Sequence, residues 1–200
     1  MTVDTTGRIG FGRDGKTRVL RAEQWLPAAP DAVWRFVADC RHMNHVIPRF
    51  VRFEVRGWDG TPIEEHHGPP PTVAAGGTYD YRLHLHGLGV RWRTLITEVD
   101  ALRRFVDEQA KGPYAAFAHE HTFEPTDDGT LTRDVIRYRP PGGPLAGLVD
   151  RLAVRRDLRA LFVCRHRRLA ELFAEHPDPA ALLDQRPTPG VHRAGATIPA

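Results

Sequence analysis

Two histidines and several carboxylates are the residues of this sequence whose types and spacing could support chemistry. His119 and His121 stand two residues apart in a stretch of strand-like alternation, so both side chains point to one face of the predicted strand. By the same parity, Asp107 and Asp134 in neighbouring predicted strands share that face. A histidine with a pKa of about 6.5 could carry the proton in aldol closure or loss of water. His119, His121 and Asp134 are therefore our candidate catalytic residues.

In this interpretation, His119 or His121 is the general acid or base, and Asp134 or Asp107 orients it. A tyrosine would donate a hydrogen bond to a developing enolate, the candidates being Tyr114 and Tyr138. The alternative is a hydrogen-bonded network within the core, because a polar group buried without a partner costs about 1–3 kcal/mol. The sequence leaves both interpretations open.

A metal site built from His119, His121 and Asp134 is geometrically conceivable, since residues i and i+2 share a face. The sequence places no third histidine beside them, and metal sites need a supporting shell of hydrogen bonds. We expect no metal and no nucleotide cofactor. The sequence also contains no Gly-x-Ser-x-Gly or His-Glu-x-x-His motif, so hydrolase chemistry lacks support.

Apart from its polar groups, the same face of the predicted strands is mainly aromatic. The opposite face is rich in arginine and glutamate, which is typical of a solvated exterior. An inward apolar face interrupted by a few polar groups predicts a pocket for a small, largely apolar molecule. The residues expected to bind this molecule are Tyr81, Trp92, Asp107, Gln109, Tyr114, Phe117, Tyr138 and Phe162.

The elements that position these residues follow from changes in hydrophobic period along the chain. The pattern predicts a strand at 17–26, a helix beginning at Pro30, and a short helix at 42–46 that ends before Pro48. Short connections between the later strands imply an antiparallel meander. Those strands are expected at 50–56, 78–85, 90–99, 103–110, 115–124 and 130–139.

A long helical pattern covers 145–176. Its apolar stripe begins with Leu145, Leu148, Val149 and Leu152 and continues from Leu158, and the offset between the two parts predicts a kink. We interpret the arginines of this helix as a solvated face rather than a nucleic-acid or membrane surface. They are Arg151, Arg155, Arg156, Arg159, Arg165, Arg167 and Arg168.

Composition divides the chain into one domain and two ends. Residues 1–16 have little apolar content and predict a flexible N-terminal arm, and residues 17–176 form the domain. Residues 177–200 form a Pro-rich flexible tail, in which a short turn at 180–183 is the one element expected. A net charge of +3 gives little reason to expect nucleic-acid binding. No apolar run is long enough for stable membrane insertion. Cys40 and Cys164 suggest free thiols in a reducing, cytoplasmic setting. The oligomeric state stays open.

Several strings together resemble the SRPBCC superfamily, also called START or birch-allergen-like, in its bacterial ligand-binding and polyketide cyclase/dehydratase-like branch. The resemblance runs from about residue 24 to residue 173. It is carried by Pro30-Asp31-Ala32-Val33-Trp34, Trp92-Arg93-Thr94-Leu95-Ile96, Gly112-Pro113-Tyr114, His119-Glu120-His121-Thr122-Phe123 and Pro140-Pro141-Gly142. It implies an α+β helix-grip fold, in which a curved antiparallel sheet wraps around a long C-terminal helix and two short helices follow the first strand.

The resemblance also implies a cavity for a lipid-, quinone- or polyketide-like molecule. The alternative function is a polyketide cyclase, aromatase or dehydratase that uses the His, Asp and Tyr side chains of the pocket, so whether the protein is an enzyme stays open. Two features depart from the family's pattern. Phe117 stands where a tryptophan is expected, and the segment 58–75 is longer than usual. That segment would be a lid over the pocket or, as we expect, a plain solvated loop.

Overall fold

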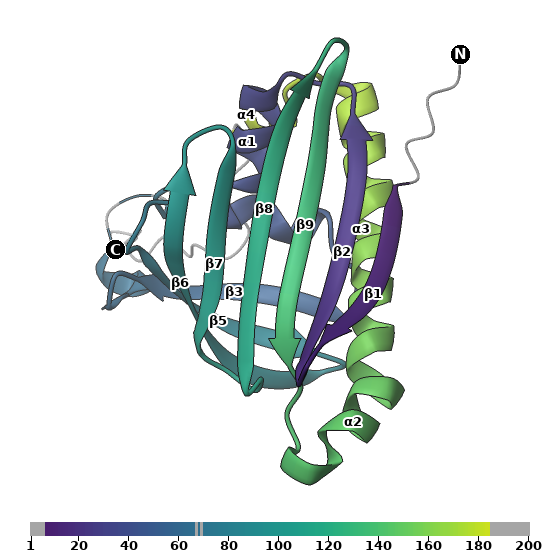
Figure 1. The fold of residues 1–200 in the computed structure, drawn as a ribbon. Coiled ribbons are helices and arrows are strands. Elements are labelled where there is room, and N and C mark those ends of the chain that lie inside the picture. The colour runs from purple at the N-terminus through teal and green to yellow at the C-terminus, as the bar shows by residue number, and fades with distance from the viewer. Residues whose placement is uncertain (1–6, 67, 69, 185–200) are drawn as a thin grey trace, which may run out of the picture.

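The computed structural model describes residues 7–66, 68 and 70–184, and its main feature is one antiparallel sheet. Within these residues the sheet has nine strands in the order β1-β2-β9-β8-β7-β6-β5-β3-β4, and it curls so that β3 and β5 cross behind β7, β8 and β9 (Figure 1). The strands are β1 (Arg8–Asp14), β2 (Thr17–Leu26), β3 (Val51–Trp58), β4 (Thr61–Pro62), β5 (Thr78–Leu85), β6 (Leu88–Asp100), β7 (Arg104–Lys111), β8 (Ala116–Thr126) and β9 (Gly129–Arg139).

Helices cover the inner face of this sheet. Two short ones, α1 (Pro30–Val37) and the 3₁₀-helix η1 (Cys40–His45), follow β2, as expected. The C-terminal helical segment consists of η3 (Gly143–Leu145), α2 (Ala146–Val149), the π-helix η4 (Asp150–Val154) and α3 (Arg155–Glu175), and α4 (Pro179–Asp184) follows it. The expected α+β helix-grip fold is therefore confirmed. In the part of the chain described, no helix is long and apolar enough to cross a membrane.

Helix α1 begins where local chemistry favours it. Pro30 occupies the first turn, where its missing N–H is not needed, and Asp31 pairs with Arg35 one turn later at 2.9 Å. Its buried side packs on the sheet through Trp34, whose ring meets the rings of Phe105 and Phe123 edge-on at 5.6 and 5.5 Å. This contact closes one end of the space between sheet and helices.

Helix α3 runs along the sheet behind β1 and β2 (Figure 1). Its inward side chains Leu158 and Phe162 pack against Leu20 of β2 and Ile136 of β9. Further along the same helix, Leu169 and Phe173 join the buried apolar cluster around α1. Because the helix lies over β1 and β2 and reaches β9 only through its side chains, the part of the sheet formed by β5 to β8 is left less closely covered.

The N-terminal segment corrects one sequence expectation. Residues 8–14 do not form a flexible arm but strand β1, paired with β2 from Arg8 opposite Glu23 to Asp14 opposite Thr17. Phe11 of this strand lies under the guanidinium groups of Arg155 and Arg159, at 4.7 and 5.3 Å from its ring centre. These cation–π contacts tie a polar, Gly-containing strand to α3. Residues 1–6 of the expected arm lie outside the described residues.

The start of the C-terminal helical segment corrects a second expectation. The sequence predicts that Leu145, Leu148 and Leu152 face the core, but their exposed fractions are 64%, 55% and 64%. The predicted kink is present as the π-helix η4, whose wider turn rotates the following residues relative to the preceding turn. Val149 and Val154, both half-buried, line the cavity in place of the leucines.

Two segments expected to be loops contain structure. Within 58–75, the loop carries β4 and the short 3₁₀-helix η2 (Ile63–Glu65), and the backbone N–H of Val73 donates to the carbonyl of Ala38 at 3.2 Å. The expected tail from residue 177 begins with α4, where Ala180 is buried against the α1 cluster. Residues 185–200 of the tail lie outside the described residues.

Candidate functional site

A cavity of about 420 Å³ lies between the sheet and the helices, over β5 to β8. Most of its wall is apolar, with Tyr81, Trp92 and Phe117 on the sheet side and Phe162 of α3 and Ala153 of η4 on the helix side. Ligand pockets commonly enclose about 300–1,000 Å³ and combine an apolar lining with a few polar groups. The volume and the lining both fit that description.

Most of the residues that the sequence assigns to the site line this cavity. They are Tyr81, Trp92, Asp107, Tyr114, Phe117, His119, His121 and Phe162. Among the described residues, the other three assigned to the site, Gln109, Asp134 and Tyr138, are not part of the cavity lining. Their side chains hold other groups in place.

Gln109 fixes the loop that carries Tyr114. Its Nε2 donates to the carbonyl of Tyr114 at 2.9 Å, and its Oε1 accepts from the Tyr114 backbone N–H at 3.1 Å. Tyr138 instead donates its hydroxyl to Asp150 at 2.8 Å, and Arg18 holds the other oxygen of that carboxylate at 3.0 Å. Tyr138 thus ties β9 to η4, whereas Tyr114 faces the cavity. Burial raises the pKa of Tyr114, so its phenol stays a hydrogen-bond donor.

Strand register explains how the polar side chains meet. Asp107 of β7 is opposite His119 of β8, and His121 of β8 is opposite Asp134 of β9. Side chains that are directly or diagonally opposite on one face of a sheet are within reach of each other. The two histidines therefore stand between two carboxylates, one from each neighbouring strand.

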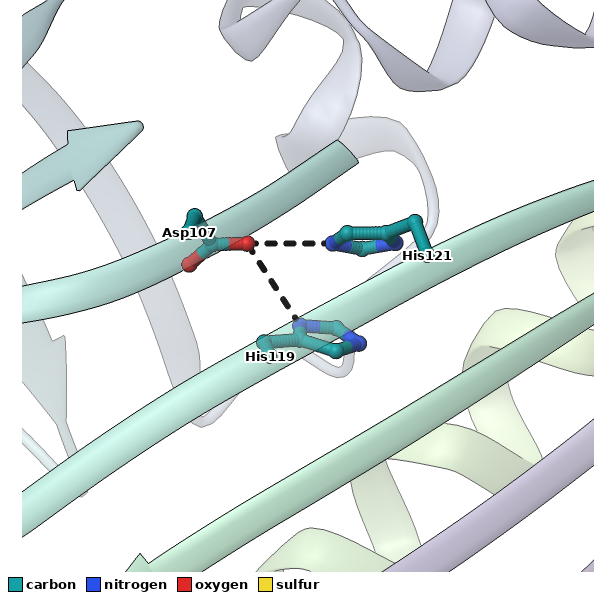
Figure 2. Close-up of side chains that lie close together, drawn as sticks. All are labelled: Asp107, His119 and His121. Atoms are coloured by element: carbon teal, nitrogen blue, oxygen red, sulfur yellow. Dashed lines mark hydrogen bonds and ion pairs between the residues drawn. The ribbon is translucent and has the colours of Figure 1, made fainter. Parts of the chain in front are cut away.

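In Figure 2, dashed lines join one oxygen of Asp107 to a ring nitrogen of each histidine. Nε2 of His121 lies 3.1 Å from Oδ2 of Asp107, and Nδ1 of His119 lies 3.9 Å from the same oxygen. On the other side, Nε2 of His119 donates to Oδ1 of Asp134 at 2.9 Å, and Nδ1 of His121 lies 2.8 Å from that oxygen. Each carboxylate thus contacts both imidazoles.

The protonation states of the cluster follow from burial and from these contacts. Burial alone would raise the pKa of Asp134, but Arg165 and the two histidines outweigh it and hold the pKa well below its ordinary value. Burial lowers the pKa of His119, and the charge of His121 lowers it further. Burial also acts to lower the pKa of His121, but the contacts with Asp107 and Asp134 outweigh burial and raise it.

These shifts give the histidines different roles. Asp134 is ionised and can only accept, so Nε2 of His119 carries the hydrogen that it donates. A neutral His119 in this tautomer has its lone pair on Nδ1, which lies 3.9 Å from Oδ2 of Asp107, and its side chain lines the cavity. His121, with the raised pKa, bonds to Asp107 through Nε2 at 3.1 Å, and its Nδ1 lies 2.8 Å from Asp134 outside hydrogen-bond geometry. Two neighbouring imidazoles with pKa values shifted in opposite directions are an arrangement suited to acid–base chemistry.

Arg165 is a member of the site that the sequence analysis misses. The sequence predicts a solvated side chain, but Arg165 is only 12% exposed, lines the cavity, and places Nε 4.0 Å from Oδ2 of Asp134. Its helical spacing is the available signal, because Arg165 stands seven residues after Leu158 and three after Phe162, on the buried stripe. Arginine is usually a surface residue, but the position of Arg165 on the buried side of α3 places its side chain inside the protein.

Cys40 of η1 also lines the cavity, although the sequence analysis does not place it in the site. Burial raises the pKa of its thiol to about 12, with a further contribution from Asp39. No pattern in the sequence distinguishes Cys40 as a lining residue, since η1 offers no period long enough to define a face.

The fold and the site define a class: a helix-grip protein with an internal, mainly apolar cavity and a polar cluster on its wall. A family model described as "Polyketide cyclase / dehydrase and lipid transport" matches residues 26–162. The chain therefore belongs to this family. No curated protein matches the chain.

Solved structures share the fold at low sequence identity. Protein CV1439 from Chromobacterium violaceum is 16% identical with a TM-score of 0.56, over 78% of this chain and 96% of that one. The protein TTHA0849 from Thermus thermophilus is 20% identical with a TM-score of 0.54, over 76% and 96%. The di-domain ARO/CYC StfQ from the steffimycin biosynthetic pathway is 15% identical with a TM-score of 0.57, over 80% of this chain and 51% of that one. At these identities the likeness concerns the fold.

Proposed function

We propose that this protein binds a hydrophobic small molecule, lipid-, quinone- or polyketide-like, in the cavity between its sheet and α3. The observation that carries the proposal is a 420 Å³ space with a mainly apolar wall and one polar cluster, formed by Asp107, His119, His121 and Arg165. Apolar surface transferred from water into such a space gains about 25 cal/mol per Å². The polar cluster would orient an oxygen-bearing part of the ligand.

The first test is to find the ligand. Native mass spectrometry of protein purified from its own host, followed by solvent extraction, should detect a bound hydrophobic molecule. For protein stripped of that molecule, adding it back at 100 times its Kd should stabilise the fold by about 2.7 kcal/mol, measured as a rise in Tm. If no molecule is retained, and lipid, quinone and polyketide panels leave the Tm unchanged, the proposal is wrong.

A matched pair of variants tests whether the ligand occupies this cavity. Ala153 lines the cavity but is also exposed to solvent, so a larger side chain has room there. The substitution Ala153→Trp should therefore fill part of the cavity and disturb the fold little. Ala101, in the exposed turn after β6, takes the same substitution away from the cavity. We expect Ala153→Trp to weaken ligand binding at least tenfold and Ala101→Trp to leave it unchanged. Equal binding by both variants would place the ligand elsewhere.

A second candidate is an enzyme of the cyclase or dehydratase type, and one observation favours it. Nε2 of His119 is engaged by Asp134, which leaves Nδ1 on the cavity wall able to accept a proton from a bound chain. A cavity that folds a flexible chain also gains rate through orientation. His119→Ala should then abolish conversion of the molecule identified above. The control variant His84→Ala, which removes an imidazole that pairs with Glu54 outside the cavity, should leave the conversion unchanged. Wild-type conversion by His119→Ala would exclude this role.

A further inference from the structure

We propose that Asp107, His119 and His121 form a binding site for one divalent transition-metal ion of the zinc type, on the wall of the cavity. Each residue offers one ligand atom, and the three atoms lie within 4.8 Å of one another (Figure 2). The site uses residues of β7 and β8 that face the cavity, so an ion there would be in contact with whatever the cavity holds.

The distance between Asp107 and His121 already matches a zinc site, the distance between Asp107 and His119 must shorten, and the two imidazole rings, whose centres are 3.7 Å apart and inclined by 39°, must open away from each other. Zn²⁺ bonds to imidazole nitrogen and carboxylate oxygen are about 2.0–2.2 Å long, so neighbouring ligand atoms in a tetrahedral site are about 3.3 Å apart. Here Oδ2 of Asp107 lies 3.1 Å from Nε2 of His121 and 3.9 Å from Nδ1 of His119. An ion between the three atoms would replace the proton that His121 now shares with Asp107.

The supporting shell that a metal site needs is present, and it is Asp134. Histidines that bind a metal commonly donate their other ring N–H to a carboxylate, which fixes the tautomer and the ring orientation. Nε2 of His119 donates to Oδ1 of Asp134 at 2.9 Å, whereas Nδ1 of His121 lies 2.8 Å from the same oxygen without hydrogen-bond geometry, so Asp134 orients His119 directly. The nitrogens turned away from Asp134 are the two that converge on Asp107. Asp134 is thus a positioning residue of the proposed site and not one of its ligands.

The charges of the cluster also favour a cation. With both imidazoles neutral, the carboxylates of Asp107 and Asp134 carry two negative charges and the guanidinium of Arg165 carries one positive charge. One negative charge is then left in a largely buried setting, where isolated charge is costly. Either a proton on His121 or a metal ion at the three ligands compensates it. Arg165 approaches Oδ2 of Asp134, whereas both histidines contact Oδ1.

Three protein ligands leave at least one coordination position for an oxygen atom. Two imidazoles and one carboxylate with an open position are a donor set found for zinc and other divalent transition metals, which polarise carbonyl groups as Lewis acids. The open position would take a carbonyl, enolate or carboxylate oxygen of the cavity ligand. In this state Nδ1 of His119 holds the ion and cannot act as a base, so metal binding and the proton-accepting role of His119 exclude each other.

The test is direct metal binding to the tag-free protein after chelation. Titration calorimetry with Zn²⁺ should show one equivalent with micromolar or tighter affinity, and Co²⁺ should produce the visible absorption of a four- or five-coordinate site. His119→Ala and Asp107→Asn should each lose both signals. Asp134→Asn should weaken binding about 10–100-fold, the usual effect of removing a supporting carboxylate. His84→Ala controls for adventitious binding to a surface histidine beside a glutamate.

A rise of Tm with Zn²⁺ in the unmodified protein tests the site without relying on variants that could misfold. The proposal is overturned if the wild-type protein binds no Zn²⁺ at micromolar concentration, or if His119→Ala binds it as tightly as wild type. Retention of the hydrophobic ligand is measured on the metal-free protein, so the metal site and the ligand-binding function can fail independently.

Discussion

Asp134 accepts a hydrogen bond from Nε2 of His119 at 2.9 Å, although the carboxylate does not reach the cavity that the imidazole lines. Asp134 lies on β9, beneath α3, and Arg165 of that helix closes over its second oxygen. The aspartate is therefore the buried centre on which the site is built. It sets which nitrogen of His119 faces the cavity, whether that nitrogen takes a proton or an ion.

Replacing this carboxylate should destabilise the protein strongly. Asp134→Ala would leave Arg165 and His121 without the buried charge that they contact, and removing one partner of a buried ion pair costs about 3–5 kcal/mol. Urea unfolding of the variant should show a free energy of unfolding lowered by about that amount. Asp128→Ala, in the exposed β8–β9 turn, should change it by less than about 0.5 kcal/mol. Equal effects would show that the cluster contributes little to stability.

A second prediction separates Arg165 from its neighbours on α3. Arg165→Met keeps an apolar stem but removes the cation beside Asp134, so we expect the free energy of unfolding to fall by about 1–3 kcal/mol. Arg167 on the same helix is 64% exposed and only pairs with Glu171 at 3.8 Å. Arg167→Met should therefore cost less than about 0.5 kcal/mol, as surface pairs do. Both variants make the same chemical change, so the difference between their free energies of unfolding, measured by urea unfolding, reports the different surroundings of the two arginines.

The sequence predicts which face of a strand a residue occupies better than it predicts how deep that residue lies. Alternation places His119, His121, Asp107 and Asp134 on one face, and the structure has them there, because parity follows from strand geometry alone. Whether each lines the cavity depends on how far α3 stands from the sheet above it. Side chains of the helix reach β9, so Asp134 is covered, whereas Asp107 of β7 is open to the cavity.

The errors of the sequence analysis have similar causes. Strand β1 contains Gly10 and Gly12 and few apolar residues, so its strand signal is weak, and its pairing is supported by contacts to β2 and α3 that are distant in sequence. The leucines from 145 to 152 follow an α-helical period, so the sequence predicts that they share one buried face. The π-helix at 150–154 changes the period, and the residues that face the core differ from those that the α-helical pattern predicts. Tertiary contacts override the local pattern in both segments.

The corrected N-terminal strand gives a third prediction. Phe11→Leu keeps apolar bulk but removes the ring face on which Arg155 and Arg159 lie at 4.7 and 5.3 Å, and each such contact at an exposed site contributes about 0.5–1 kcal/mol. A double-mutant cycle with Arg159→Ala should therefore give a coupling energy of about 0.5–1 kcal/mol from chemical unfolding. A coupling energy of zero in this cycle would mean that the contact between Phe11 and Arg159 does not help to hold β1.

Cys40 provides the fourth prediction, which concerns reactivity and pH. Burial raises the pKa of its thiol from the ordinary 9.0 to about 12, and only the thiolate reacts with alkylating reagents. At pH 8 the reactive fraction is then about a thousandfold smaller than for an ordinary thiol. Cys164→Ser leaves Cys40 as the one thiol of the chain, and its rate with iodoacetamide should be at least a hundredfold below that of the same protein unfolded in urea.

The pH dependence separates a raised pKa from simple blockage of the cavity. For a pKa of about 12 the neutral thiol persists above pH 9, so the logarithm of the alkylation rate should rise linearly with pH from 7 to 10. In the unfolded protein the rise should level off near pH 9, where an ordinary thiol is half ionised. A plateau near pH 9 in the folded protein would mean that Cys40 meets solvent more freely than its burial among Tyr81 and the other cavity residues implies.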